Sequence, residues 1–258
     1  MTSPLPLLQI DHVSKRFGQV VIADDLFFSV GSGDIVGIVG PNGAGKTSLF
    51  GLISGDLAPG SGEIRFAGQT VTRLDSAARC RLGMGRTYQV PRPFADMTVF
   101  ENLLIAAQQG GGMRRRASYA AAVEALERTG MAAQANTPAE RLGLLQRKRL
   151  ELARALATQP TLLLLDEVAG GLTDPEVAQL VEIVRDVNAQ GIAVIWIEHV
   201  VRALTAVVSR LICLAGGRFV GDGDPSSVLA EPAVREVFLG TDVTSALARE
   251  PTSSPDAP

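Results

Sequence analysis

The chain has 258 residues, of which 46% are hydrophobic and 20% are charged, and its formal net charge is −3. This length and hydrophobic content suffice for a large core, which excludes a disordered chain and a small disulfide scaffold. The slightly negative charge excludes a global basic field for gripping nucleic acid, so no nucleic-acid partner is expected.

Cysteine usage and apolar run length indicate the compartment. Cys80 and Cys213 are the two cysteines, and their spacing fits no metal site. Without a secretory leader ahead of them, they indicate a reducing cytosol. Uninterrupted apolar runs such as residues 162–165 and 192–197 fall far short of the roughly 20 residues that span a bilayer. A role at a membrane would therefore come through a partner.

The first elements surround a glycine-rich loop. Short β-like segments at residues 7–13, 20–30 and 63–66 predict a mixed sheet edge. The apolar run 35–39 predicts a strand before the loop, and the amphipathic stretch after it predicts a helix. The loop residues are Gly40, Pro41, Asn42, Gly43, Ala44, Gly45, Lys46 and Thr47, followed by Ser48.

The loop matches G-x-x-x-x-G-K-[ST], the pattern of a phosphate-binding loop between a strand and a helix. The glycines let successive backbone N–H groups point at the β- and γ-phosphates, and the helix N-terminus adds partial positive charge. Lys46 would neutralise the phosphates, and Thr47 would ligate Mg²⁺. The sequence therefore predicts a nucleotide triphosphate as ligand, in preference to an ordinary glycine-rich turn.

The middle of the chain has a helical pattern from residue 76 to residue 158. It predicts a helical subdomain at about residues 90–158, inserted in the catalytic core. The basic clusters 114–116 and 147–149 are interpreted as solvated faces. Beyond this region, the apolar runs 162–165 and 192–197 predict buried parallel strands joined by a helix at about 175–190. The expected fold class is therefore α/β.

Polar residues follow both of these predicted strands. Asp166 and Glu167 come directly after the first strand, at the sheet edge where α/β proteins place their ligands. Asp166 would hold Mg²⁺, directly or through water, and Glu167 would polarise the attacking water as general base. An acidic pair at a strand end is also common in caps and loops, but the phosphate loop favours the catalytic interpretation. His199 follows the second strand and would hydrogen-bond the γ-phosphate and the water.

With these pieces in place, residues 7–240 resemble the ATP-binding cassette (ABC) family of transporter ATPases. The resemblance implies a P-loop NTPase core with a mixed sheet edge and the inserted helical subdomain. The stretch Gly85-Arg86-Thr87-Tyr88-Gln89 looks like the family's glutamine loop, in which Gln89 would touch Mg²⁺ and report on the γ-phosphate to a membrane subunit. Phe17 matches the aromatic residue that stacks on adenine; the alternative is a strand residue of the core.

The family's signature LSGGQ is altered here. Its position holds Leu142, Gly143, Leu144, Leu145 and Gln146. Family members act in pairs, and each signature serves the nucleotide of the partner. Gly143 replaces the serine that would reach the γ-phosphate, and Leu145 replaces a glycine that permits close backbone approach. The hypothesis is an asymmetric pair with a weaker site on the partner; alternatively, backbone N–H groups at the helix start suffice.

The resemblance within the family is strongest to the ATPase subunits of branched-chain and hydrophobic amino acid importers, in residues 89–103, 197–200 and 217–240; urea and amide importers share these features. It implies a second ATPase subunit, identical or different, two membrane permeases that dock near residues 89–101, and a periplasmic solute-binding protein. The chain would then lie at the cytoplasmic face of the inner membrane.

Three alternatives stay open: an exporter of lipid or lipopolysaccharide, a cytosolic ATPase of DNA repair or translation, and a nucleotide-binding regulator with little turnover. Residues 241–258, rich in Ser, Thr, Pro and Ala, predict a disordered tail.

Overall fold

The structure is a computed structural model that describes residues 5–239. Its strands are β1 (Leu8–Phe17), β2 (Val20–Val30), β3 (Ile35–Val39), β4 (Ser61–Phe66), β5 (Gln69–Thr70), β6 (Met84–Arg86), β7 (Leu162–Asp166), β8 (Ala193–Ile197), β9 (Arg210–Ala215) and β10 (Arg218–Gly223). Its helices are α1 (Lys46–Ser54), α2 (Ser76–Arg81), α3 (Val99–Ile105), α4 (Arg115–Arg128), α5 (Leu144–Ala157), α6 (Asp174–Ala189), α7 (Val201–Thr205), α8 (Pro225–Ala230) and α9 (Pro232–Leu239). A π-helical turn, Ala106–Gly110, continues α3.

A six-stranded sheet in the order β10-β9-β3-β8-β7-β6 forms the centre of the molecule. Strands β9, β3, β8, β7 and β6 are parallel, and β10 pairs antiparallel with β9. Along β7, Leu162 and Leu164 contribute to the core on one face of the sheet, and Leu163 and Leu165 contribute to the core on the other. This two-sided burial explains why the strand sequence is continuously apolar.

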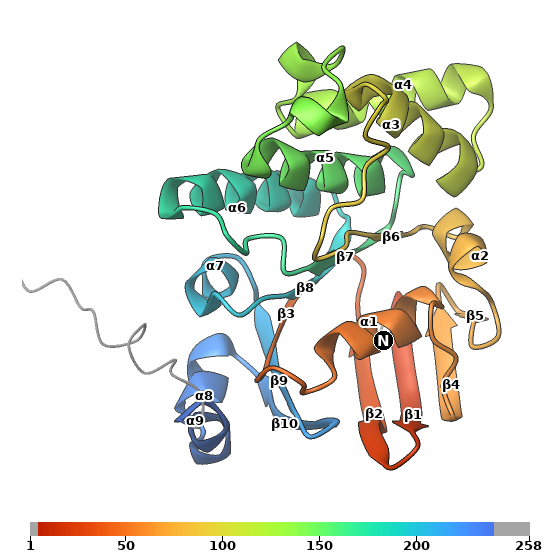
Figure 1. Ribbon diagram of the computed structural model, residues 1–258. Coiled ribbons are helices and arrows are strands. Elements are labelled where there is room, and N and C mark those ends of the chain that lie inside the picture. Colours follow the sequence, from red (N-terminus) through yellow and green to blue (C-terminus); the bar gives the residue numbers. More distant parts are fainter. Residues whose placement is uncertain (1–4, 240–258) are drawn as a thin grey trace, which may run out of the picture.

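A second sheet, antiparallel and in the order β2-β1-β4-β5, packs over helix α1 (Figure 1). Phe28 of β2, Phe50 of α1 and Ile195 of β8 belong to one buried cluster, so α1 is held between the two sheets. The phosphate loop, residues 40–45, joins β3 to α1 and is therefore anchored at both ends by buried elements.

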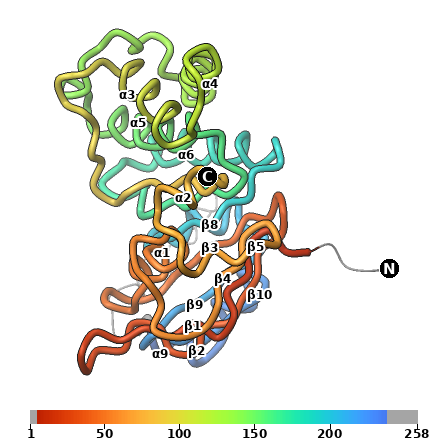
Figure 2. Tube along the Cα trace, turned by 90° about the vertical axis from the view of Figure 1, so that its right-hand side faces the viewer, coloured from red at the N-terminus to blue at the C-terminus, as the bar shows by residue number. Residues whose placement is uncertain are grey.

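Helices α3, α4 and α5 lie together on the opposite side of the main sheet, as the side view also shows (Figure 2). Leu103 of α3, Ala122 of α4 and Leu152 of α5 share a buried cluster with Trp196 of β8. These helices fall within residues 90–158. The boundaries of a separate helical subdomain stay a prediction.

Strand β6 is the clearest departure from the predicted elements, because it lies inside the stretch expected to be helical. Its three residues pair in parallel with β7, with Met84 opposite Leu162 and Arg86 opposite Leu164. A Cβ on Gly85 would lie 3.0 Å from the Cβ of Pro160, so glycine suits this close approach. A three-residue strand carries too little periodicity to be read from sequence.

The predicted strands at residues 20–30, 162–165 and 192–197 and the helix at about 175–190 are confirmed. No helix between residues 5 and 239 combines the length and apolar character needed to traverse a lipid bilayer. The predicted tail, residues 241–258, lies outside the described residues.

Candidate functional site

The phosphate loop depends on glycines for its close packing. A Cβ on Gly40 would lie 2.1 Å from the carbonyl oxygen of Leu214, and one on Gly45 would lie 2.5 Å from that of Ile22. Gly45 also has a φ of 102°, in the region that favours glycine. The loop therefore has its shape because both positions lack a side chain.

Lys46 is buried at the centre of this loop. Its ammonium Nζ donates to the carbonyl oxygens of Gly40, at 2.8 Å, and Pro41, at 3.1 Å. Burial lowers the pKa of Lys46, and the carboxylates of Glu167 and Asp166 oppose that effect. The Lys46 ammonium is thus held on the loop by hydrogen bonds, and the negative charges of Glu167 and Asp166 attract it.

A cavity of about 290 Å³ opens over the loop. Its lining joins the loop to two residues from distant parts of the chain: Ile22, Asn42, Gly43, Ala44, Gly45, Lys46, Thr47, Ser48, Gln89 and Glu167. Predicted phosphate ligands, the predicted glutamine and the predicted base therefore share one space, although they are far apart in sequence.

Glu167 is the residue in this cavity with the most unusual backbone. It follows β7 with a φ of 47°, a left-handed conformation that is uncommon outside glycine. Its carboxylate Oε2 accepts a hydrogen bond from Nε2 of Gln89 and lies 3.8 Å from Nδ1 of His199. The structure thus brings the three predicted catalytic side chains together.

Asp166, the last residue of β7, is almost completely buried. Its Oδ2 pairs with Nη2 of Arg86 at 3.2 Å, while its Oδ1 accepts no hydrogen bond from any residue in the range 5–239. Burial raises the pKa of Asp166, and the Arg86 guanidinium opposes that rise. A buried carboxylate oxygen without a donor fits a site for Mg²⁺ or one of its waters.

Arg86 is a site residue whose role sequence reasoning missed. Its Nη1 donates to Asp56 at 2.7 Å and to Ser54 Oγ at 2.9 Å, so one guanidinium joins the end of α1 to Asp166. Arg86 stands within the stretch resembling the glutamine loop, but sequence gives no sign of its two carboxylate partners.

Lys148 contradicts the interpretation of residues 147–149 as a solvated face. Its side chain is only 5% exposed, and its Nζ donates to the carbonyl oxygens of Gln89, at 2.8 Å, and Glu167, at 3.1 Å. Helix α5 turns this side chain toward the site while Arg147 stays exposed. An isolated lysine inside a basic run gives no sequence signal of such burial.

The altered signature lies apart from the cavity. Gly143 is the N-cap of α5, and none of Leu142, Gly143, Leu144, Leu145 and Gln146 lines the space over the described phosphate loop. Phe17 ends β1 with 51% exposure, and Nζ of Lys15 lies 5.3 Å from its ring centre. Phe17 is therefore not a core residue, and its contact with adenine stays a prediction.

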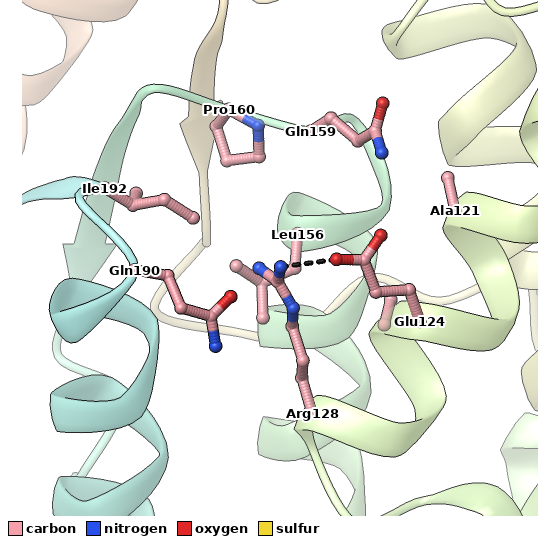
Figure 3. Close-up of a pocket in the computed structure, with 9 residues that line it drawn as sticks. Ala121, Glu124, Arg128, Leu156, Gln159, Pro160, Gln190 and Ile192 are labelled. Atoms are coloured by element: carbon pink, nitrogen blue, oxygen red, sulfur yellow. Dashed lines mark hydrogen bonds and ion pairs between the residues drawn. The ribbon is translucent and has the colours of Figure 1, made fainter.

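A second cavity, of about 220 Å³, lies between α4, α5 and the end of α6 (Figure 3). Glu124 and Arg128 form an ion pair within α4 at its centre, and the carboxamides of Gln159 and Gln190 lie around it. None of the predicted site residues lines this cavity.

Comparison with known proteins decides the family. The family model described as ABC transporter matches residues 23–170. The chain belongs to the ABC transporter family. It is 33% identical over 250 residues to the high-affinity branched-chain amino acid transport ATP-binding protein LivG of Escherichia coli K12, covering 91% of this chain and 98% of the relative. It is 32% identical over 234 residues to the lipopolysaccharide export system ATP-binding protein LptB of Acidithiobacillus ferridurans, covering 91% and 97%.

A solved structure agrees. The ADP conformation of an ATP-binding cassette of an ABC transporter superposes with a TM-score of 0.85 at 28% identity, covering 92% of this chain and 99% of that one. The predicted fold class is confirmed, and the chain is an ATP-hydrolysing subunit of an ABC transporter.

Proposed function

We propose that this ABC transporter ATPase drives the import of branched-chain or related hydrophobic amino acids. The observation that carries the hydrolytic part is the single cavity shared by the phosphate loop, Gln89 and Glu167. The similarity to LivG, which extends over almost the whole length of both proteins, supports the substrate class.

Binding of ATP follows from the loop. Its backbone N–H groups and the N-terminus of α1 would receive the phosphates, with Ser48 and Thr47 at the helix start. The ammonium of Lys46, now on the carbonyl oxygens of Gly40 and Pro41, would turn to the phosphate oxygens. Phe17 would stack on the adenine.

Hydrolysis would use the side chains that meet at Glu167. Glu167 would accept a proton from the attacking water, Gln89 would orient its carboxylate, and His199 would donate a hydrogen bond to the γ-phosphate. Thr47, Gln89 and Asp166 would hold Mg²⁺, which neutralises phosphate charge when bound. The donor-free Oδ1 of Asp166 suits that assignment.

The partners follow from what the cavity lacks. Within the described chain, none of residues 142–146 lines the cavity over the phosphate loop. A second ATPase subunit would therefore supply the signature for this site. Two permeases and a periplasmic solute-binding protein would complete the importer, and this chain would then lie at the cytoplasmic face of the inner membrane. Docking of the permeases near Gln89, Arg92 and Phe94 would connect ATP to transport.

The test is Mg-ATP hydrolysis by the chain alone and with its partner and permease subunits in lipid. Glu167→Gln should lower turnover in the complex by about 100-fold or more, because a general base is lost. Glu182→Gln, an exposed position on α6, is the matched control and should keep the rate. Nucleotide binding without turnover in either setting would instead support a regulatory module.

Export is the second candidate, because LptB is 32% identical over nearly its full length. Co-purification with a periplasmic binding protein, and stimulation of hydrolysis by that protein loaded with leucine, would support import. Stimulation by lipopolysaccharide and no response to amino acids would support export.

A further inference from the structure

The backbone of Glu167 is in a conformation that needs support. Its φ of 47° is left-handed, and the residue has no glycine-like freedom to adopt it without help. Its N–H donates to the carbonyl oxygen of Ile197 at 2.9 Å, which fixes the end of β7 against β8. The direction of the side chain also depends on the carbonyl group of Glu167, which belongs to the next peptide unit.

Lys148 binds the carbonyl group of Glu167. Its ammonium reaches from α5 to the carbonyl oxygen of Glu167, at 3.1 Å, and also to that of Gln89, at 2.8 Å. Two of its three N–H donors therefore bind the backbones of Gln89 and Glu167, whose side chains also form a hydrogen bond with each other. A buried ammonium bonded to carbonyl oxygens is a costly arrangement unless charge nearby compensates it.

Glu198 supplies a second anchor for this turn, and burial raises the pKa of its carboxyl group. This fully buried residue accepts the N–H of Ala169 at 2.6 Å and Nε1 of Trp196 at 3.3 Å, both on Oε1. Burial lowers the pKa of Lys148, and the attraction of Glu198 is the largest effect that opposes it. The turn from Glu167 to Ala169 is thus held by the Lys148 ammonium at one peptide and by the Glu198 carboxyl group at another.

We propose that Lys148 and Glu198 are a pair of positioning residues that fix the turn after β7 and thereby aim the carboxylate of Glu167 at the attacking water. The inference rests on the proposed role of Glu167 as base. Because Lys148 is on the helix that begins with the altered signature, it also ties the segment facing the partner's nucleotide to this subunit's own base.

Lys148→Met, which keeps the length of the side chain and removes the ammonium, is the main test in the assembled complex. Loss of a hydrogen bond from a charged donor should lower kcat by about ten- to a hundredfold. KM and Mg-ATP affinity should stay within about twofold, because the loop that binds the phosphates is untouched. Arg149→Met is the matched control, since its guanidinium contacts Gln179 on α6 instead and should leave kcat unchanged.

Substitutions at Glu198 are an independent test. They distinguish the hydrogen bond that supports the backbone of the turn from the charge of the carboxylate. Glu198→Gln keeps an oxygen for the N–H of Ala169, whereas Glu198→Met removes it. The fall in kcat should therefore be larger for Glu198→Met than for Glu198→Gln. This series also decides the question if Lys148→Met does not fold.

Combination with Glu167→Gln distinguishes positioning from a purely structural role. If Lys148 acts through the Glu167 carboxylate, Lys148→Met should cause no further fall in the residual rate of Glu167→Gln. An equal fall in both backgrounds, a wild-type kcat for Lys148→Met, or a parallel loss of ATP affinity would overturn the inference. Full activity of Glu167→Gln would instead overturn the proposed role of Glu167 itself.

Discussion

Single residues shape this site largely through the space they leave or fill. Gly40 and Gly45 let the phosphate loop touch the carbonyl oxygens of Leu214 and Ile22, and any side chain there would collide with backbone. Asp166 and Lys148 do the opposite, since each places an ionisable group where it is almost completely buried. The site is therefore sensitive both to added bulk in the loop and to changes at these buried groups.

The Cys213 thiol reports on the integrity of the main sheet. It is fully buried on β9, and burial raises its pKa to about 11. At pH 8 the native thiol is therefore protonated and unreactive, whereas an unfolded cysteine has a pKa of about 8.5. We expect iodoacetamide at pH 8 to alkylate Cys213 about 100-fold more slowly in the native protein than in urea, as measured by mass spectrometry.

Half-exposed Cys80 on α2 is the internal comparison. Equal alkylation rates for Cys213 in the native and the urea-treated protein would contradict its burial.

Among the secondary-structure elements, α3 has the most complete N-terminal cap. The side chain of Thr98 accepts the N–H of Glu101, and the carboxylate of Glu101 accepts the N–H of Thr98. Thr98→Ala should lower the free energy of unfolding by about 1 kcal/mol, since it removes a cap, and Thr98→Ser should restore most of it. Urea denaturation measures both, and equal stability of the two variants would show that the cap contributes nothing.

The same cap makes α3 sensitive to acid. Hydrogen bonds from the backbone and side chain of Thr98 lower the pKa of Glu101. The stabilisation by this carboxylate is therefore complete above its unfolded pKa, about 4.3, and is lost as the pH falls through the lower folded value. The difference in stability between wild type and Thr98→Ala should shrink over that acidic range.

Sequence predicted the elements that have long, periodic or continuous apolar patterns and missed those that depend on a neighbour. Strands β7 and β8 are buried on both faces, so their composition alone identifies them. Strand β6 has three residues and exists because β7 lies beside it. No pattern in one segment encodes the partner that a short edge strand requires.

The same reason separates the predicted site residues from those that were missed. The phosphate loop is a local motif whose residue types follow from its ligand. Arg86, Lys148 and Glu198 act through contacts with residues 19 to 80 positions away, at Asp166, Glu167 and Ala169. Lys148 in particular stands in a basic run whose other members are solvated or half-exposed.

At the scale of the whole molecule, the cavity over the phosphate loop and helix α5 are separate, because no residue of α5 lines that cavity. The helix α5 begins at Leu144 with Gly143 as its N-cap, and within the described chain no side chain caps it. Its first N–H groups are thus free to receive an anion from a facing subunit. Turnover should therefore require a second ATPase subunit, and the start of α5 would bind the phosphates of the ATP held by that subunit.

The altered signature would determine how much activity the partner's ATP site loses. A Cβ on Gly143 would lie 2.7 Å from Oε1 of Gln146, the mobile end of a side chain, so serine fits after that amide swings away. Thr173, by contrast, already donates its hydroxyl to Glu176 and caps α6, so a substitution there would also disturb that helix. Restoration at the signature is therefore the cleaner test of the interface.

We expect Gly143→Ser combined with Leu145→Gly to raise ATP turnover at the partner's site by about tenfold, because a hydrogen bond to a charged phosphate oxygen is regained. The rate is measured in a reconstituted complex in which this chain also carries Glu167→Gln, so that its own site contributes little. Because the increase arises at the partner's site, it should vanish when the partner's own base is removed. An unchanged rate would mean that the N–H groups at the start of α5 are enough, and that the pair is not asymmetric in catalysis.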